Sequence, residues 1–381
     1  MFGEWIKVLR LETERLSLHT EVLSSEGPFT LMLRSVFSFL SSGWRLASMS
    51  ALLLLGTSAS ALAFSPVASA QSLPAPKAYV GLFNDNAVAV FDTGTNQILS
   101  TIPVPTGPHG IVITPDNRWV YVSSDGASTV SVIDTNTDAV ANSIDVGQTP
   151  HGLAITPDGG MVLVAGFGTS QVSAIDTATN QILWKVGVPN PHNIAITQDG
   201  KTAYVASQGQ NAPALATIDL TNGTLVGTMA LDNTPRALNV SPDGHELFFT
   251  EAGVDAVQVL DLATNQIVDQ IAVGASPHLP SFTSDGNLGL VVAQGPGELD
   301  VVDPEAYTVL GAVKVGTMPH WTATSSDSGT AYVTNELSND VSVVDLGSQT
   351  VTATIAVGNA PRKIVVQQAA AAAPTAAAMD W

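Results

Sequence analysis

A unit of about 42 residues recurs along the chain, and its period constrains the fold more than any other feature. A proline precedes one predicted strand of each unit, at spacings of 42, 41, 44, 42, 42 and 42 residues: Pro108, Pro150, Pro191, Pro235, Pro277, Pro319 and Pro361. An aspartate that closes a V-x-V-x-D run is a second marker in the same register: Asp92, Asp134, Asp176, Asp219, Asp261, Asp303 and Asp345. A period of 40 to 45 residues with four short strands indicates a β-propeller blade.

One complete unit shows the four strands. They are predicted at Gly152–Thr156, Met161–Ala165, Gln171–Asp176 and Gln181–Val186. Pro157-Asp158-Gly159 forms the first turn, with residues that favour tight turns. An open β-solenoid is the alternative fold, but its repeats are usually 20 to 30 residues long and it needs capping ends.

The two ends of the repeat region complement each other. Near the start, Lys77–Phe83, Ala87–Asp92 and Gln97–Val104 supply three strands of a blade without its first strand. Near the end, Lys363–Val366 supplies a first strand without the other three. Together they complete a seventh blade and close the ring, which removes free sheet edges. The sequence therefore predicts an all-β, seven-bladed propeller of four-stranded antiparallel blades over residues 71–366.

The motif Tyr332-Val333-Thr334-Asn335, together with the recurring pattern G-x-x-P-H-G followed by V-S-V-I-D-T, resembles the YVTN β-propeller repeat proteins. The resemblance covers roughly residues 78–366 and implies a WD40-like, seven-bladed, mostly extracytoplasmic propeller. It implies little about activity, because similar propellers occur in surface-layer proteins, DNA-binding periplasmic proteins, lactonases, quinoprotein dehydrogenases and copper-dependent nitrous oxide reductase.

Residues 1–70 are predicted to be an N-terminal extension and a secretory signal peptide. The apolar run Ala51–Phe64 follows Arg34 and Arg45 and precedes Ala68-Ser69-Ala70, which is the layout of a signal peptide cleaved after Ala70. The alternative is a retained membrane anchor, but the run is shorter than the roughly 20 residues that a span requires. We therefore expect a secreted or periplasmic protein without a transmembrane span in its mature form.

Two further segments lie outside the predicted propeller. Residues 1–31 contain five glutamates, an unusual start for a secretion signal, so translation is expected to begin at Met32 or this piece is a non-structural extension. Residues 367–381 are rich in alanine and are predicted to form a disordered tail.

Composition excludes several kinds of chemistry. The chain has 13 basic and 33 acidic residues, and the net charge of −20 lies entirely after residue 70. Such a surface repels phosphate backbones, so nucleic acid is not an expected partner. The absence of cysteine excludes disulfides, thiolate metal sites and covalently attached c-type haem. We expect a monomer.

The residue that follows each marker proline is the main candidate for a site. In a propeller this residue lies beside the central channel, just before the innermost strand. Five of the seven histidines occupy this position, and arginine occupies the other two: His109, His151, His192, Arg236, His278, His320 and Arg362. The repeat thus predicts a ring of cationic or metal-coordinating side chains around one mouth of the channel.

Three explanations of this ring remain open. The histidines can be structural, bridging backbone carbonyls and neighbouring blades. Alternatively, Arg236, Arg362 and flanking histidines can bind an anionic or polar ligand, since arginine offers a fork of donors. The third explanation is a copper or zinc site formed by His109, His151 and His192, similar to the histidine ring of nitrous oxide reductase. That enzyme has a fuller histidine set and a separate copper domain, which this sequence lacks.

The loops on the same face differ between repeats, and variable loops are where binding residues often lie. Glu251 follows a strand of the blade that carries Arg236, so it is expected either to pair with that arginine or to act as a general base. Asn335 lies in the corresponding loop position of the last unit. Trp321 beside His320 is either a stacking platform or a packing residue, and Lys201, Lys314 and Lys363 are predicted to be scattered rather than patched.

The sequence therefore favours a binding or protein-interaction scaffold with its ligand site at the channel mouth. The expected partner is a small anionic ligand or another extracytoplasmic or cell-surface protein, and neither a cofactor nor catalysis is expected. The alternative is an enzyme, either a lactonase-like hydrolase or a metal- or quinone-linked oxidoreductase component.

Overall fold

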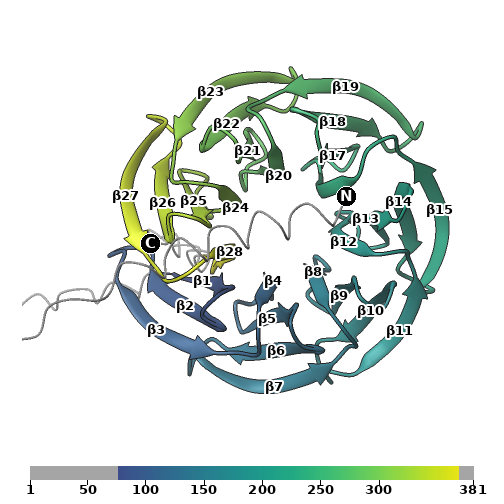
Figure 1. Ribbon diagram of the computed structural model, residues 1–381, viewed down its shortest axis with the longest axis horizontal. Coiled ribbons are helices and arrows are strands. Elements are labelled where there is room, and N and C mark those ends of the chain that lie inside the picture. The colour runs from purple at the N-terminus through teal and green to yellow at the C-terminus, as the bar shows by residue number, and fades with distance from the viewer. Residues whose placement is uncertain (1–75, 369–381) are drawn as a thin grey trace, which may run out of the picture. The chain divides into compact units, whose positions relative to one another are not determined.

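The computed structural model describes residues 76–368, which form a ring of seven four-stranded antiparallel sheets (Figure 1). The predicted seven-bladed propeller is confirmed. The predicted signal peptide and residues 369–381 of the predicted tail lie outside the described residues. None of residues 76–368 belongs to a helix of the length and hydrophobicity needed to cross a membrane.

We call the strands of each blade A to D from the channel outward. The A strands are β28 (Pro361–Val366), β4 (Pro108–Ile113), β8 (Pro150–Ile155), β12 (Pro191–Ile196), β16 (Pro235–Val240), β20 (Pro277–Phe282) and β24 (Pro319–Thr324). The B strands are β1 (Lys77–Leu82), β5 (Trp119–Ser124), β9 (Met161–Gly166), β13 (Thr202–Gly209), β17 (Glu246–Glu251), β21 (Gly289–Ala293) and β25 (Thr330–Asn335).

The C strands are β2 (Ala87–Asp92), β6 (Thr129–Asp134), β10 (Gln171–Asp176), β14 (Ala212–Asp219), β18 (Ala256–Asp261), β22 (Glu298–Asp303) and β26 (Asp340–Asp345). The D strands are β3 (Ile98–Pro103), β7 (Ala139–Asp145), β11 (Ile182–Gly187), β15 (Thr224–Ala230), β19 (Gln266–Ala272), β23 (Thr308–Lys314) and β27 (Thr350–Ala356). We number the blades 1 to 7, with β28-β1-β2-β3 as blade 1 and β24 to β27 as blade 7.

Burial follows the position of a strand in its blade. The B and C strands are almost wholly buried, whereas the D strands form the outer rim and expose aliphatic residues such as Leu99. The hydrophobic clusters lie between neighbouring blades: Tyr79 of blade 1, for example, packs in one cluster with Ile111 and Val120 of blade 2. Each blade thus buries apolar side chains against the blades on either side, so the ring gains stability only as a whole.

The ring closes through blade 1, as predicted from the sequence. Strand β28 pairs antiparallel with β1, placing Val366 opposite Ala78 and Ile364 opposite Val80. The amide of Gln367 also donates a hydrogen bond of 2.9 Å to the carbonyl of Lys77. Blade 1 is therefore held together by main-chain hydrogen bonds between the two ends of the propeller.

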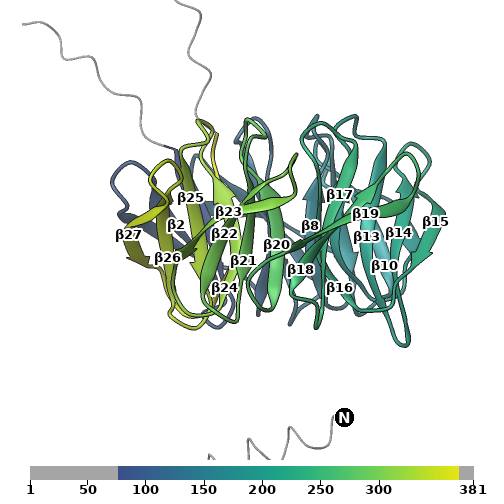
Figure 2. The ribbon, with the colours of Figure 1, turned by 90° about the horizontal axis from the view of Figure 1, so that it is seen from above.

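The loops gather on two opposite faces of the ring (Figure 2). Because Pro108 at the start of β4 pairs with Ser124 at the end of β5, the D–A and B–C loops share one face. We call this the top face, and the opposite one, which carries the A–B and C–D turns, the bottom face. The A–B turns repeat one arrangement, in which a threonine or serine hydroxyl donates to an aspartate two residues later, as Thr156 does to Asp158 at 2.5 Å.

Candidate functional site

The predicted ring residues lie inside the A strands rather than just before them. Each A strand begins at its proline, two residues earlier than the sequence suggested, because the proline already pairs with the B strand: Pro150, for example, lies opposite Gly166. A β-bulge follows between Pro150 and Leu153. The bulge breaks the simple alternation of side chains, so the second residue of the strand can point into the channel.

The chain enters six of the seven A strands through a left-handed residue. These residues, which directly precede the prolines, are Gly107, Thr149, Asn190, Ser276, Met318 and Ala360. A φ of 51° at the β-branched Thr149 is sterically costly. Strain of this kind persists only where the surrounding structure imposes it. Here it accompanies the turn from the top loops into the channel.

The five histidines converge in the channel. The ring centroids of His109 and His151 lie 3.8 Å apart, and those of His151 and His192 lie 4.1 Å apart. On the other side, His278 and His320 lie 4.5 Å apart, and His320 reaches within 5.6 Å of His109. Burial lowers the pKa of all five, that of His192 to about 4. These imidazoles are therefore neutral at neutral pH and can act as hydrogen-bond donors, acceptors or metal ligands.

The histidines divide into two groups by the partner of Nδ1. His151 Nδ1 donates to the carbonyl of His192 at 3.1 Å, and His192 Nδ1 donates to the carbonyl of Arg236 at 2.8 Å. These two support the structural explanation, in which an imidazole bridges adjacent blades. In contrast, the buried Nδ1 atoms of His109, His278 and His320 have no hydrogen-bond partner among the described residues.

The two arginines of the ring direct their guanidinium groups to other partners. Arg362 Nη2 forms an ion pair of 2.8 Å with Glu336, and its guanidinium lies 4.1 Å from the ring centroid of Phe83. Arg236 Nη1 donates to Ser276 Oγ at 3.1 Å and to the side-chain oxygen of Gln294 at 3.4 Å. Arg236 thus carries a charge without a carboxylate partner in the described part of the chain.

Glu251 and Asn335, which were predicted in loops, are the last residues of strands β17 and β25, and their polar partners are not the ring arginines. Glu251 accepts a hydrogen bond of 3.3 Å from Gln258, and its burial raises the pKa of the carboxyl group. It forms no ion pair with Arg236 among the described residues. Asn335 is fully buried, and its amide nitrogen donates to Asp340 at 2.6 Å and to Ser342 at 2.9 Å. Asn335 therefore ties together the B and C strands of blade 7.

Lys363 belongs to the channel, although the sequence suggested that it was an isolated lysine. It is only 2% exposed, and its ammonium lies 3.8 Å from the ring centroid of Trp321. Burial lowers the pKa of Lys363 to about 7, while the charge of Asp125 acts in the opposite direction. Lys363 forms none of the ion pairs found among residues 76–368.

Asp125 is the second residue that sequence reasoning did not assign to the site. It follows strand β5, and its carboxylate oxygen Oδ2 lies 3.8 Å from His151 Nε2. Burial raises the pKa of Asp125 to about 7, and the positive charges of Arg362 and Lys363 partly offset this effect. Among residues 76–368, Asp125 is thus the one carboxylate in ion-pair contact with a channel histidine, and the charges of Asp125 and Lys363 shift each other's pKa.

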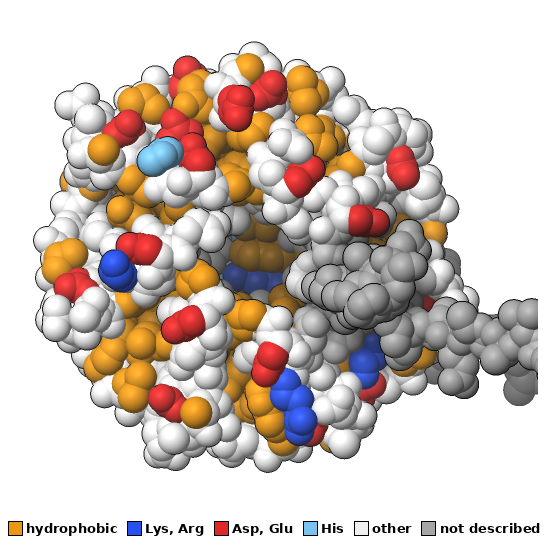
Figure 3. Space-filling view, turned by 180° about the vertical axis from the view of Figure 1, so that it is seen from behind, with side chains coloured by type: hydrophobic (Ala, Val, Ile, Leu, Met, Phe, Trp, Pro, Cys, Tyr) orange, Lys and Arg blue, Asp and Glu red, His pale blue; other side chains and the backbone are white. Residues whose placement is uncertain are grey.

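The channel differs in charge from the exterior. Figure 3 shows acidic side chains distributed around the central opening and hydrophobic and basic side chains within it. Arg236, Arg362 and Lys363 each lower the pKa of both His192 and His278, so the three positive charges act on one shared region. An acidic propeller thus encloses a positively charged channel lined by neutral imidazoles.

Residues 85–354 match the family model described as outer membrane protein assembly factor BamB. The chain belongs to this family. No curated protein sequence matches it.

Solved structures similar to this BamB-family chain share its fold at low sequence identity. Hydrazine synthase from Kuenenia stuttgartiensis is 19% identical, with a TM-score of 0.65, over 70% of this chain and 91% of that one. Dihydro-heme d1 dehydrogenase NirN in complex with DHE is 18% identical, with a TM-score of 0.58, over 74% and 64%. A functionally unknown protein from Desulfotomaculum acetoxidans DSM 771 is 16% identical, with a TM-score of 0.67, over 77% and 99%.

One sequence signal could have revealed Lys363 in this BamB-family chain. Lys363 directly follows the ring position, and the residues at this place in the other blades are Gly110, Gly152, Asn193, Ala237, Leu279 and Trp321. They range from the smallest side chain to the largest, so the position is packed differently around the ring. A lysine at a position that is glycine or apolar in five of the other six repeats is a candidate for a buried charge.

Proposed function

We propose that this protein is an extracytoplasmic binding propeller whose channel binds a small anionic ligand. The observation that carries the proposal is a pair of channel cations, Lys363 and Arg236, that have no carboxylate partner among residues 76–368. The buried charge of Lys363 is costly unless an opposite charge or hydrogen bonds compensate it, and the partly buried Arg236 has two neutral hydrogen-bond acceptors but no counter-charge. A bound anion would supply that compensation.

The surrounding groups suit a carboxylate or phosphate. Arg236 offers guanidinium donors in a planar fork, and Lys363 offers an ammonium at a site from which water is largely excluded. The Nδ1 atom of His320, which has no partner among the described residues, can carry a proton and donate a further hydrogen bond. The acidic exterior excludes large polyanions, which favours a small ligand over nucleic acid.

Three indications support an extracytoplasmic location. The leader of residues 1–70 has the layout of a secretory signal. The YVTN motif resembles that of mostly extracytoplasmic propellers, and the family is named for an outer membrane assembly factor. We infer that the mature protein is secreted or periplasmic, and that its top face is also available to a protein partner.

Isothermal titration calorimetry of the purified mature protein with inorganic phosphate and with succinate tests this function. We expect one anion to bind at a single site, and Lys363→Met or Arg236→Gln to weaken binding by roughly tenfold or more, because charge-assisted hydrogen bonds contribute about 1.5–3 kcal/mol each. Lys201→Gln is the matched control, since Lys201 is an exposed lysine paired with Asp199 outside the channel. Absence of binding, or equal losses in all three variants, would contradict the proposal.

A further inference from the structure

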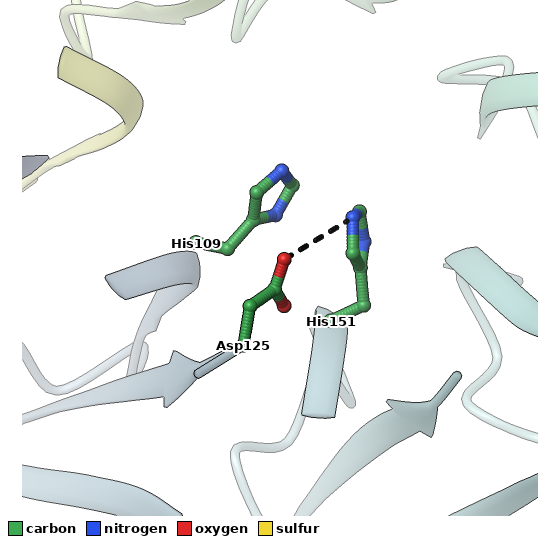
Figure 4. A group of neighbouring side chains, drawn as sticks. All are labelled: His109, Asp125 and His151. Atoms are coloured by element: carbon green, nitrogen blue, oxygen red, sulfur yellow. Dashed lines mark ion pairs between the residues drawn. The ribbon is translucent and has the colours of Figure 1, made fainter. Parts of the chain in front are cut away.

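One cluster in the channel has the composition of a metal site, and it differs from the trio expected from the sequence. His109 of β4, His151 of β8 and Asp125 after β5 each present one ligand atom, and these atoms all lie within 4.8 Å of one another. Figure 4 shows the two imidazoles and the carboxylate facing a common space. His192 does not belong to this cluster.

The hydrogen bond at His151 determines which of its nitrogen atoms can bind a cation. A backbone carbonyl can only accept, so Nδ1 of His151, which faces the carbonyl of His192 at 3.1 Å, carries the proton. Nε2 therefore has a free lone pair, and it faces Asp125 Oδ2 at 3.8 Å. A histidine whose other nitrogen donates to a carbonyl is the usual arrangement of a metal ligand, because that bond fixes the orientation of the ring.

Two further buried atoms at this place have no partner. Nδ1 of His109 and Oδ1 of Asp125 are both inaccessible to solvent and form no hydrogen bond among residues 76–368. Buried polar atoms without partners are rare in folded proteins and often indicate an ion or water that completes the site. This observation is independent of the spacing of the three side chains.

We propose that His109, Asp125 and His151 bind a divalent first-row transition cation of the Zn²⁺ class, with its remaining coordination positions open to the channel. Two imidazoles and a carboxylate, without any sulfur ligand, suit zinc, iron, cobalt or nickel better than calcium or magnesium. Ligand atoms around a tetrahedral zinc lie about 3.4 Å apart, so the side chains close by about 1 Å when the ion binds.

The charge around the cluster is compatible with a cation. Asp125, once deprotonated, contributes a negative charge at the site itself, which the predicted set of three histidines would lack. Two positive charges, those of Arg362 and Lys363, act on both histidines. The charge of Arg362 is partly offset by its 2.8 Å ion pair with Glu336, and that of Lys363 would be offset by an anion bound in the same channel. The metal site rests on observations separate from those that support anion binding.

Cobalt and zinc titrations test the site directly. Mature protein treated with a chelator and then dialysed is titrated with Co²⁺, whose visible absorption reports coordination by nitrogen and oxygen, and zinc content is measured by mass spectrometry. We expect one equivalent of metal. His151→Ala and Asp125→Asn should each weaken binding by about 100-fold or more, since even changes to groups that only orient metal ligands cost about 10–100-fold.

His278→Ala is the matched control, because it removes a histidine at the same repeat position in blade 6 that is not part of the cluster. We expect this variant to retain the affinity of the unaltered protein. Asp125→Asn preserves the shape of the side chain, and its thermal unfolding curve shows whether the propeller remains intact. Substoichiometric metal in the unaltered protein, or an equal loss in His278→Ala and His151→Ala, would overturn the proposal.

Lys363→Met separates this proposal from the function proposed above. Removing a positive charge near the cluster should leave cobalt binding unchanged or make it tighter, whereas anion binding should be lost. If both are lost in a variant that still unfolds cooperatively, the cation depends on the bound anion, and the assignment to three protein ligands alone is wrong.

Discussion

At the bottom face, six blades place a hydroxyl and an aspartate two residues apart, and all six pairs form the same hydrogen bond. The donors and acceptors are Thr114–Asp116, Thr156–Asp158, Thr197–Asp199, Ser241–Asp243, Thr283–Asp285 and Ser325–Asp327, at 2.5 to 2.7 Å. At the top of the channel, five blades repeat a histidine, but among the described residues its Nδ1 has a hydrogen-bond partner in only two of them.

This difference distinguishes a repeated residue that is structural from one that is available for binding. Every turn aspartate accepts bonds from its own turn, and those bonds lower its pKa. Three of the channel histidines bury a nitrogen that has no hydrogen-bond partner among residues 76–368. A repeated residue that makes the same local hydrogen bonds in each blade stabilises that blade. A repeated residue whose polar atoms have no partner can instead use those atoms to bind a ligand in the channel.

Deletion of residues 362–366 should have the largest effect on stability, because it removes a structural strand and two channel cations at once. It eliminates most of β28 and leaves β1 without its inner partner, so blade 1 loses its main-chain closure. We expect loss of the cooperative unfolding transition in thermal circular dichroism. Arg362→Ala, which keeps the strand, is the control. A truncated protein that melts at the same temperature as the full-length one would show that closure through β28 is dispensable.

Lys363→Met should stabilise the protein by a few kcal/mol at pH 6, because burial holds the pKa of Lys363 at about 7 instead of 10.5. Below pH 7 the lysine is charged in both the folded and the unfolded state, so the full cost of burying the charge is present. Between pH 7 and about 10.5 only the unfolded chain retains the proton, so the stability of the unaltered protein rises with pH and the advantage of the variant shrinks.

Denaturant unfolding of both proteins at pH 6 and pH 9, without ligand, measures this effect. The difference between the two proteins removes the contributions of groups that do not interact with Lys363. Asp125 and the channel histidines still contribute to the difference, because the charge of Lys363 lowers their pKa values. A variant that is less stable than the unaltered protein at pH 6 would show that Lys363 has a stabilising partner. A gain in stability together with a loss of anion binding would show that the lysine is retained for binding.

The smallest expected changes in the free energy of unfolding come from two single substitutions, one at the bottom face and one at the top of the channel. Asp158→Ala removes the acceptor for Thr156 Oγ and for the amide of Gly160, and should cost about 1–2 kcal/mol. His320→Leu replaces a buried imidazole whose Nδ1 has no partner and should be neutral or slightly stabilising. Denaturant midpoints for both variants check the contrast, and a larger loss for His320→Leu would mean that this histidine is structural.

The sequence could predict the blades because a single short unit specifies each of them. The spacing of Pro150 and Asp176 and the turn residues around Asp158 depend only on local conformation and on alternating burial. The C strands Ala87–Asp92 and Gln171–Asp176 were predicted to the residue, because the aspartate that ends them makes local turn bonds.

The site was less predictable because side-chain direction at the top face depends on the bulge in each A strand. In a regular strand, neighbouring side chains point to opposite sides of the sheet, but the bulge breaks this alternation. The directions of the ring residue and of the residue after it therefore cannot be deduced from their positions in the sequence. Lys363 therefore gave no sign of lying in the channel, and Asn335 gave no sign of pointing into its own blade. The proximity of Asp125 to His151 is a contact between blades, which a period within one chain does not encode.

The position of β28 links the channel to the integrity of the fold. Arg362 and Lys363 lie on the last strand, which joins β1 only when the ring is closed. An open ring would lack two of its three channel cations, so only the closed form could bind an anion with full affinity. By mass action, such a ligand would then stabilise closure itself. The strand that closes the ring also completes the binding site. A bound ligand in the channel would therefore indicate that the propeller is fully assembled.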